Sequence, residues 1–169
     1  MKVIDTRRSV REYNDKEVSE KEIKKILDAA MQAPSARNGQ PWEFLVVKDK
    51  EKKERIASLV PSMRMASSAS FLIIFLINKE RLIAPLYAEQ DLASSVTTAM
   101  LEARSLGIGS VWCGVTPVPE KMKNVSEVFE INDDRYQPFA LVCFGYPKNV
   151  DVFVKAKRYD KKRIHQEVL

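Results

Sequence analysis

The chain is organised around the stretch Pro34-Ser35-Ala36-Arg37-Asn38-Gly39-Gln40-Pro41-Trp42-Glu43-Phe44. Three dipeptides within it, Pro34-Ser35, Asn38-Gly39 and Gln40-Pro41, favour non-helical backbone. Gly39 tolerates a positive φ, and the proline after Gln40 pushes that residue towards an extended conformation. The stretch therefore predicts a rigid, irregular loop that joins a helix to a strand.

The polar side chains of this loop suit a flat heterocyclic ligand. Ser35 carries a hydroxyl, and Asn38 and Gln40 carry carboxamides. These groups both donate and accept hydrogen bonds without bearing a charge. The alternative is an ordinary connection between a helix and a strand, in which the polar groups satisfy the loop's own backbone and Trp42 is a core aromatic residue.

A second motif, Arg7-Arg8-Ser9-Val10-Arg11, lies near the N-terminus. Together the two segments resemble the nitroreductase family of FMN-dependent oxidoreductases, which opens with an Arg-Arg-Ser-x-Arg-like segment and later shows Pro-Ser-x-x-Asn-x-Gln-Pro-Trp. The spacing between the motifs also matches. The resemblance continues through Gly107-Ile108-Gly109-Ser110-Val111-Trp112-Cys113-Gly114 and a basic C-terminal segment, so it covers nearly the whole chain.

The resemblance implies that residues of both motifs bind FMN: Arg7, Arg8, Ser9, Arg11, Pro34, Ser35, Ala36, Asn38 and Gln40. It implies an arginine at the phosphate, Ser9 at a ribityl hydroxyl and Arg11 near the pyrimidine side of the flavin. The planar fork of arginine fits phosphate, and a cation stabilises negative charge that appears on reduction. In an extended segment Arg7, Ser9 and Arg11 would face one side, with Arg8 and Val10 on the other. Without the loop motif, an exposed basic patch would be the better interpretation of these arginines.

The segment 107–114 contains glycines but lacks the Gly-x-Gly-x-x-Gly pattern and follows a helix, which excludes a dinucleotide-binding motif. NADH or NADPH would then bind over the flavin and leave before the oxidant arrives, which gives ping-pong kinetics. The resemblance places Trp112, Cys113 and Gly114 beside the hydride-accepting nitrogen of the flavin. The alternative is a short buried strand with an incidental cysteine.

The C-terminal segment forms a second basic cluster, made of Lys155, Lys157, Arg158, Lys161, Lys162 and Arg163. If the fold brings the two chain ends together, this cluster and the N-terminal arginines make one anion site, with a phosphate as its natural ligand. The resemblance places Lys155, Lys157 and Arg158 near the FMN phosphate, with an alignment that is loose by a residue or two.

Composition indicates one globular domain over residues 1–169, with 45% hydrophobic residues and a net charge of +5. The basic residues are mostly interleaved with acids, so we expect no nucleic-acid partner. The longest apolar run, 71–77, is too short to span a membrane, and the charged N-terminus has no signal core. Cys113 and Cys143 suit free thiols in a reducing cytoplasm. His165 has no Cys or His nearby, so no metal site is expected.

Hydrophobic periodicity predicts the elements around the loop. A capping box, Ser19 to Glu22, should start a helix that runs to about Ala33 and buries one face; its members are Ile23, Ile26, Leu27, Ala30 and Met31. A strand over 43–48 should be followed by a helix from Asp49 that buries Ile56, Leu59 and Val60. A long helix over 84–106 should end at Gly107, and 138–147 should be a central strand.

The resemblance implies an α+β fold: a mostly antiparallel central sheet flanked by helices, in a homodimer with swapped terminal segments and FMN at its interface. The residues alone are equally compatible with a mixed α/β sheet. The implied function is NAD(P)H-dependent reduction of a small electron-poor acceptor, such as a nitroaromatic or a quinone. Alternatives are a specialised member (a dehalogenase, an enoate or thiazoline oxidoreductase, or a deazaflavin-dependent enzyme) and a non-catalytic flavin-binding or nucleic-acid-binding module.

Overall fold

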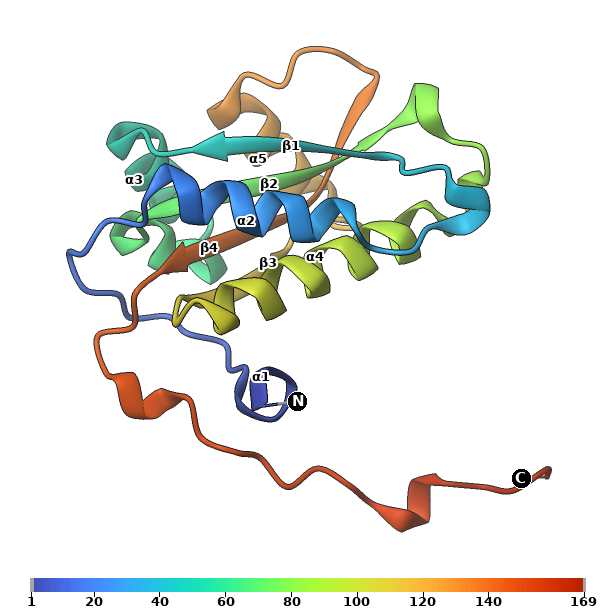
Figure 1. Cartoon of the computed structure of the whole chain (residues 1–169). Coiled ribbons are helices and arrows are strands. Elements are labelled where there is room, and N and C mark those ends of the chain that lie inside the picture. Colours follow the sequence, from blue (N-terminus) through green and yellow to red (C-terminus); the bar gives the residue numbers. More distant parts are fainter. Residues whose placement is uncertain (1, 169) are drawn as a thin grey trace.

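A four-stranded antiparallel sheet forms the centre of the protein, whose computed structural model describes residues 2–168 (Figure 1). The strands are β1 (Trp42–Val47), β2 (Phe71–Asn78), β3 (Gly109–Gly114) and β4 (Tyr136–Gly145). Their order across the sheet is β1-β2-β4-β3, and every neighbouring pair is antiparallel. This arrangement confirms the predicted α+β class and the central position of the last strand.

Helices cover both faces of the sheet (Figure 1). The α2 helix (Glu20–Met31) and the α4 helix (Ala88–Ser105) pack on one face, with Phe71, Ile73 and Phe75 of β2 in that layer. The other face carries α3 (Lys50–Leu59), the 3-10 segment η2 (Pro61–Ser68) and α5 (Pro119–Phe129), with Leu72 and Ile74 beneath them. Because both faces of β2 are buried, its sequence is continuously apolar, and each large side chain there contributes roughly 1.5–3 kcal/mol.

The helix that leads into the loop begins as predicted and ends earlier. Ser19 and Glu22 form the capping box of α2, and Val18 and Ile23 are both 3% exposed beside it. The helix stops at Met31 instead of near Ala33, and the Met31 side chain is 47% exposed. The predicted burial of Met31 is therefore wrong. Ala30 (0% exposed) and Ala33 (7%) are buried, so Met31 lies at the margin of the packed face.

The α3 helix shows the same error at its end. Leu59 was expected inside but is 46% exposed, whereas Ile56 and Val60 are buried as predicted. Lys53 takes up the remaining buried position, and its ammonium group donates hydrogen bonds to the carbonyls of Ala69 (2.7 Å) and Ser70 (3.3 Å). A buried lysine is acceptable here because both bonds satisfy its charge.

The α4 helix spans the length of the domain between the loop and the N-terminal segment. It begins at Ala88, because residues Pro85–Tyr87 form a separate 3-10 turn, η4, instead of the first turn of the helix predicted from 84. Gly107 ends it with a φ of 76°, as predicted for left-handed geometry. Ser95, fully buried, donates a hydrogen bond of 2.9 Å to the carbonyl of Ala30 and so fixes α4 against α2.

Both chain ends lie on the same side of the domain (Figure 1). The short α1 helix (Lys2–Thr6) precedes the arginine motif, and the segment after β4 runs past α1 as an extended tail with brief 3-10 turns. In the part of the chain that the structure describes, no helix is long and apolar enough to cross a membrane.

Candidate functional site

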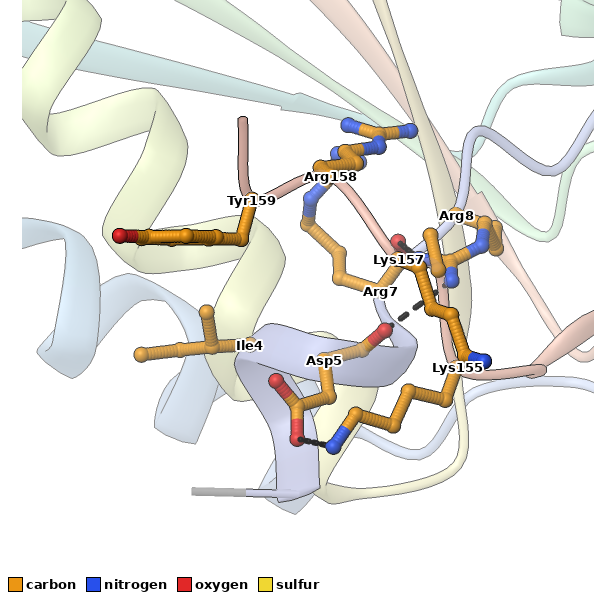
Figure 2. Close-up of a pocket in the computed structure, with 9 residues that line it drawn as sticks. Ile4, Asp5, Arg7, Arg8, Lys155, Lys157, Arg158 and Tyr159 are labelled. Carbon is orange, nitrogen blue, oxygen red and sulfur yellow. Dashed lines mark hydrogen bonds and ion pairs between the residues drawn. The ribbon is translucent and has the colours of Figure 1, made fainter. Parts of the chain in front are cut away.

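A basic cavity of about 560 Å³ lies where the two chain ends meet (Figure 2). Its walls are α1, the arginine motif and the tail, and its lining residues are Ile4, Asp5, Arg7, Arg8, Lys155, Ala156, Lys157, Arg158 and Tyr159. The fold thus brings the N-terminal arginines together with Lys155, Lys157 and Arg158 of the second cluster. Lys161, Lys162 and Arg163 are exposed farther along the tail and are not among the lining residues.

Arg7 and Arg158 are the two cavity guanidiniums without a hydrogen-bond or ion-pair partner among the described residues. Burial lowers the pKa of Arg7 from the ordinary value, and the positive charges of Arg158 and Arg8 lower it further. Asp5, the acid in the lining, lies 3.5 Å from the Lys155 ammonium group through its Oδ2 atom. The cavity therefore holds like charges whose mutual repulsion a bound anion would relieve.

Unlike Arg7, Arg8 is bonded to the backbone around the cavity. Its guanidinium donates hydrogen bonds to the backbone carbonyls of Arg7, Asp5 and Val154. The backbone N–H of Ala156 also donates to the Asp5 carbonyl (3.3 Å), so the tail is fastened to α1. Arg8 thus shapes the cavity by holding its two walls together.

The predicted alternation along the arginine motif holds for one part of it. Val10 is 3% exposed, whereas Ser9 and Arg11 on either side are exposed. Arg7 and Arg8 do not alternate, because both line the same cavity. The reason is that the Arg7 N–H still donates to the Val3 carbonyl (2.9 Å) as part of the last helical turn, so the extended geometry begins after it.

The arginine motif docks on the outer edge of β3. The Val10 N–H donates to the Ser110 carbonyl (2.9 Å), and a Cβ on Gly109 would stand 2.7 Å from the Cβ of Val10, so glycine permits this approach. Peptide groups two residues apart in a strand point the same way. Those of Trp112 and Gly114 therefore face outward like that of Ser110, beyond the segment that the motif covers.

Lys121 reaches this open edge from α5. Its ammonium group donates a 3.4 Å hydrogen bond to the Gly114 carbonyl. Gly114 is exposed, and a Cβ placed on it would contact nothing within 4 Å. Lys121 was missed in the sequence because a lysine near a helix start normally indicates a solvated side chain.

The side chains of Trp112 and Cys113 turn away from that edge in opposite directions. Trp112 is half-buried against Phe139, with ring centroids 5.8 Å apart. The Cys113 thiol lies in the opposite layer, 3.8 Å from the Met65 sulfur and 3.7 Å from the Ser62 carbonyl oxygen. A ligand at the open edge would therefore meet the backbone of Trp112 and Gly114 and not the sulfur of Cys113.

The loop adopts a conformation that the sequence did not predict. Gly39 has an ordinary φ of −68°, while Arg37 (53°), Asn38 (54°) and Gln40 (47°) occupy the left-handed region. The extended geometry expected for Gln40 is wrong. Non-glycine residues rarely hold positive φ unless surrounding contacts require it.

Hydrogen bonds hold the loop in this shape. The Gln40 N–H donates to the Ser35 hydroxyl (3.0 Å), and the Gln40 carboxamide donates to Asn38 Oδ1 (3.1 Å). The Ala36 N–H donates to the carboxylate of Asp91 in the first turn of α4 (2.8 Å). Asp91 was not among the predicted site residues, because an acid in a first helical turn usually only balances the helix dipole.

The loop still presents polar groups to a ligand. Pro34, Asn38 and Gln40 are exposed, Ser35 and Ala36 are half-buried, and Trp42 is 4% exposed in the core. The Asn38 amide N–H₂ and the Gln40 side-chain carbonyl take no part in the hydrogen bond between the two carboxamides. The alternative of an ordinary connection between a helix and a strand explains Ser35 and Trp42. It does not explain the Asn38 amide and the Gln40 carbonyl, which could bind a ligand.

Loop and arginine motif lie at opposite ends of α4 (Figure 1). Asp91 holds the loop at the first turn, and Arg104 in the last turn donates a 2.9 Å hydrogen bond to Thr6, just before the motif. At 1.5 Å per residue the two anchors are about 20 Å apart. Within one chain, the basic cavity includes no residue of the loop.

No group of three His, Cys, Asp or Glu side chains within residues 2–168 is arranged to hold a metal ion. The cavity and the loop offer cations, amides and backbone groups instead. These favour an organic anion over a metal.

Comparison with known proteins gives a family. A model described as the nitroreductase family matches residues 4–70 and 62–146. A protein of Archaeoglobus fulgidus, provisionally named an NADH dehydrogenase/NAD(P)H nitroreductase, is 40% identical over 99% of this chain and 97% of its own. The FMN reductase [NAD(P)H] of Bacillus subtilis is 27% identical over 99% of this chain and 73% of its own. An FMN-dependent nitroreductase of Clostridium difficile superposes with a TM-score of 0.87 at 27% identity, covering 99% and 98% of the two chains.

Proposed function

This chain belongs to the nitroreductase family, and from that premise we propose that it is an FMN-dependent oxidoreductase. It takes hydride from NADH or NADPH and passes electrons to a small electron-poor acceptor, such as a nitroaromatic or a quinone. Relatives named as an FMN reductase and an FMN-dependent nitroreductase support this assignment.

The observation that carries the proposal is the basic cavity between the chain ends. Arg7, which lacks a carboxylate partner among the described residues, lies near Arg158 in it. A phosphate monoester offers three oxygens and up to two negative charges, which suit an arginine fork and nearby cations. The FMN phosphate therefore fits this end of the site.

The groups beside the cavity suit the rest of FMN. Ser9 and Arg11 are exposed along the edge of β3, and the Trp112 and Gly114 peptide groups face outward there. FMN, when bound, supplies the hydride-transfer chemistry. Arg11 would bind at its pyrimidine side, Ser9 at a ribityl hydroxyl, and the Gly114 peptide would approach closely because no side chain intervenes.

A second copy of the chain completes the site in this proposal. The loop with Asn38 and Gln40 lies about 20 Å along α4 from the arginine motif, measured between the anchors of the two segments. In a homodimer, the loop of one protomer reaches the cofactor held by its partner's arginines. The tail supports such an assembly, since it carries exposed apolar side chains: Val154 (60%), Tyr159 (82%), Ile164 (52%) and Val168 (78%).

Donor and acceptor share one surface of the cofactor in this proposal. Neither the sequence nor the described structure supplies a glycine-rich strand-to-helix turn for a dinucleotide. The reduced nicotinamide binds, reacts and leaves before the acceptor enters, which gives ping-pong kinetics. In this proposal, donor and acceptor each bind in turn at the open edge beside Gly114.

Anaerobic stopped-flow absorbance of the purified yellow protein tests the proposal. NADH or NADPH should bleach the flavin, and a nitroaromatic or quinone should restore the colour. The Arg7→Ala variant should lose flavin, whereas Arg55→Ala, which removes an exposed arginine on α3, should retain it. A colourless protein that binds DNA with a steep salt dependence would contradict the proposal.

A further inference from the structure

The two cysteines of the chain are diagonal neighbours on one face of the sheet. Cys113 in β3 is opposite Leu141, and Cys143 in β4 is opposite Val111. Diagonal positions on paired strands share a face of the sheet, with their Cα atoms about 7–8 Å apart. Both thiols lie in the layer beneath α3, η2 and α5, with Cys113 6% exposed and Cys143 fully buried.

The surroundings make the two thiols unequal. Hydrogen bonding between the two side chains lowers the pKa of Cys113 and, together with burial, raises that of Cys143 well above its ordinary value. Burial opposes this effect at Cys113, and the nearby Arg11 and Lys121 cations lower its pKa further. Reactive cysteines are thiolates in electropositive surroundings, often beside a second cysteine that resolves the oxidised form.

We propose that Cys113 and Cys143 form a peroxide-sensitive pair that closes reversibly to an intrachain disulfide. The Cys113 thiolate, at the less buried position, is the attacking group. Cys143, in contact with it and shielded from solvent, is the resolving group. The FMN-dependent reaction uses neither thiol, so this inference stands apart from the proposed function.

Hydrogen peroxide is the oxidant in both steps. The Cys113 sulfur bonds to one peroxide oxygen while the O–O bond breaks, and the departing hydroxide takes up a proton as water. The Cys143 sulfur then displaces the hydroxyl group of the sulfenic acid, forming the S–S bond while the S–O bond breaks. The Cys143 proton leaves with that hydroxyl as a second water. Two thiols thus supply the two electrons that reduce one peroxide.

The backbone explains why such a bond would be reversible. Diagonal residues in an antiparallel sheet are about 7–8 Å apart, whereas disulfides require Cα atoms closer than about 7 Å. Closure therefore requires β3 to slide against β4. On its outer side the edge strand β3 is bridged at Ser110 by Ser9. Just past its far end, the Val115 and Thr116 N–H groups donate to the Phe139 carbonyl (3.2 and 3.0 Å), so closure has to strain this pairing. A bond formed under strain is readily reduced.

The test is mass spectrometry of the purified protein, first fully reduced and then treated with a small excess of hydrogen peroxide. The wild type should lose two hydrogens, fail to react with a thiol-alkylating reagent after denaturation, and yield a cross-linked peptide pair containing both cysteines. Dithiothreitol should restore both free thiols. These measurements need no variant, so they remain valid if a substitution disturbs folding.

Two variants identify the roles. In Cys143→Ser, peroxide should oxidise Cys113 to a sulfenic acid that no second thiol resolves, and further peroxide should convert it to a sulfinic acid, which dithiothreitol does not reduce. In Cys113→Ser, Cys143 should stay alkylatable after the same treatment. The proposal is overturned if the wild type keeps both thiols, accumulates oxygenated Cys113 beside a free Cys143, or forms only disulfides between chains on a non-reducing gel.

Discussion

The Asp91 carboxylate accepts a hydrogen bond of 2.8 Å from the backbone N–H of Ala36. Asp91 is 7% exposed in the first turn of α4, so a buried acid fixes the start of the loop. The loop contains three non-glycine residues with positive φ, and this hydrogen bond is one of the contacts that stabilise their strained conformation. A single side chain thus couples the longest helix to the recognition loop.

Replacing Asp91 with alanine should loosen the loop. The Ala36 N–H would lose its acceptor, and an unsatisfied buried donor costs about 1–3 kcal/mol. We expect this loss in urea unfolding of the apo-protein, together with weaker FMN binding. Asp91→Asn keeps an acceptor oxygen and should lose less. Wild-type stability and FMN affinity in Asp91→Ala would show that the contact is dispensable.

Arg7 and Arg8 should differ in their effects on the cofactor. A charge-assisted hydrogen bond contributes about 1.5–3 kcal/mol, so Arg7→Ala should weaken FMN binding roughly 10–100-fold. Arg8 is bonded to carbonyls of α1 and the tail, and Arg8→Ala should instead expose the tail to limited proteolysis. Fluorescence titration with FMN measures the first effect. Equal losses of affinity in the two variants would contradict this division of roles.

Asn38→Ala should lower cofactor affinity with little effect on the fold. The Asn38 side chain is exposed and bonds only to Gln40 within the described residues. Alanine costs roughly 1 kcal/mol at the positive φ of residue 38, so thermal unfolding of the apo-variant should shift only slightly from that of the apo wild type, while the FMN dissociation constant rises. An apo-variant that is unfolded under conditions where the apo wild type is folded would make Asn38 a structural residue.

Glu22 should make the stability of the fold dependent on acid pH. Hydrogen bonds from Ser19 and Tyr146 lower its pKa to about 2, and the bond to Glu22 raises the pKa of Tyr146 to about 12. Because the folded-state pKa of Glu22 is depressed, its contribution is fully present above the unfolded pKa of about 4.3. It is lost as pH falls from there towards 2.

The comparison of wild type with Glu22→Gln measures this effect. The wild type should be more stable by at most about 1 kcal/mol at pH 7, since Glu22 is open to solvent screening. The difference should shrink below pH 4.3. Tyr146→Phe removes one of the two hydrogen-bond donors to Glu22. The stability difference between this variant and the wild type should therefore also shrink below pH 4.3, by a smaller amount. A difference that is constant between pH 7 and pH 2.5 would contradict the assignment.

The sequence predicted the architecture well because the signals involved are local. The capping box at Ser19, the apolar run of β2 and Gly107 after α4 each depend on neighbours in the chain, and the structure confirms them. The sequence predicted one anion site from the two basic clusters on the condition that the fold joins the chain ends, and only the structure shows that the ends meet. Errors at Met31 and Leu59 arose because periodicity places a residue near the apolar face but does not show how wide the packed part of that face is.

The loop conformation could not be predicted, because distant partners determine it. Local rules favoured a positive φ at Gly39 and an extended Gln40, whereas Asp91, 55 residues along the chain from Ala36, helps select the opposite arrangement. Nor could the sequence show that α4 separates the loop from the arginines. Spacing along a chain does not reveal which protomer supplies each group.

The most direct test of the account is complementation between two variants. Arg7→Ala and Asn38→Ala homodimers should each bind FMN weakly, because every site lacks one group. If one site combines Arg7 of one protomer with Asn38 of the other, a mixed dimer from co-expression contains one intact site and one doubly altered site. Random pairing makes about half of the dimers mixed, so about one site in four is intact. At an FMN concentration that fills intact sites but not altered ones, about that fraction of the sites should bind FMN. A mixed preparation that binds no more FMN than its two parents would contradict the shared site.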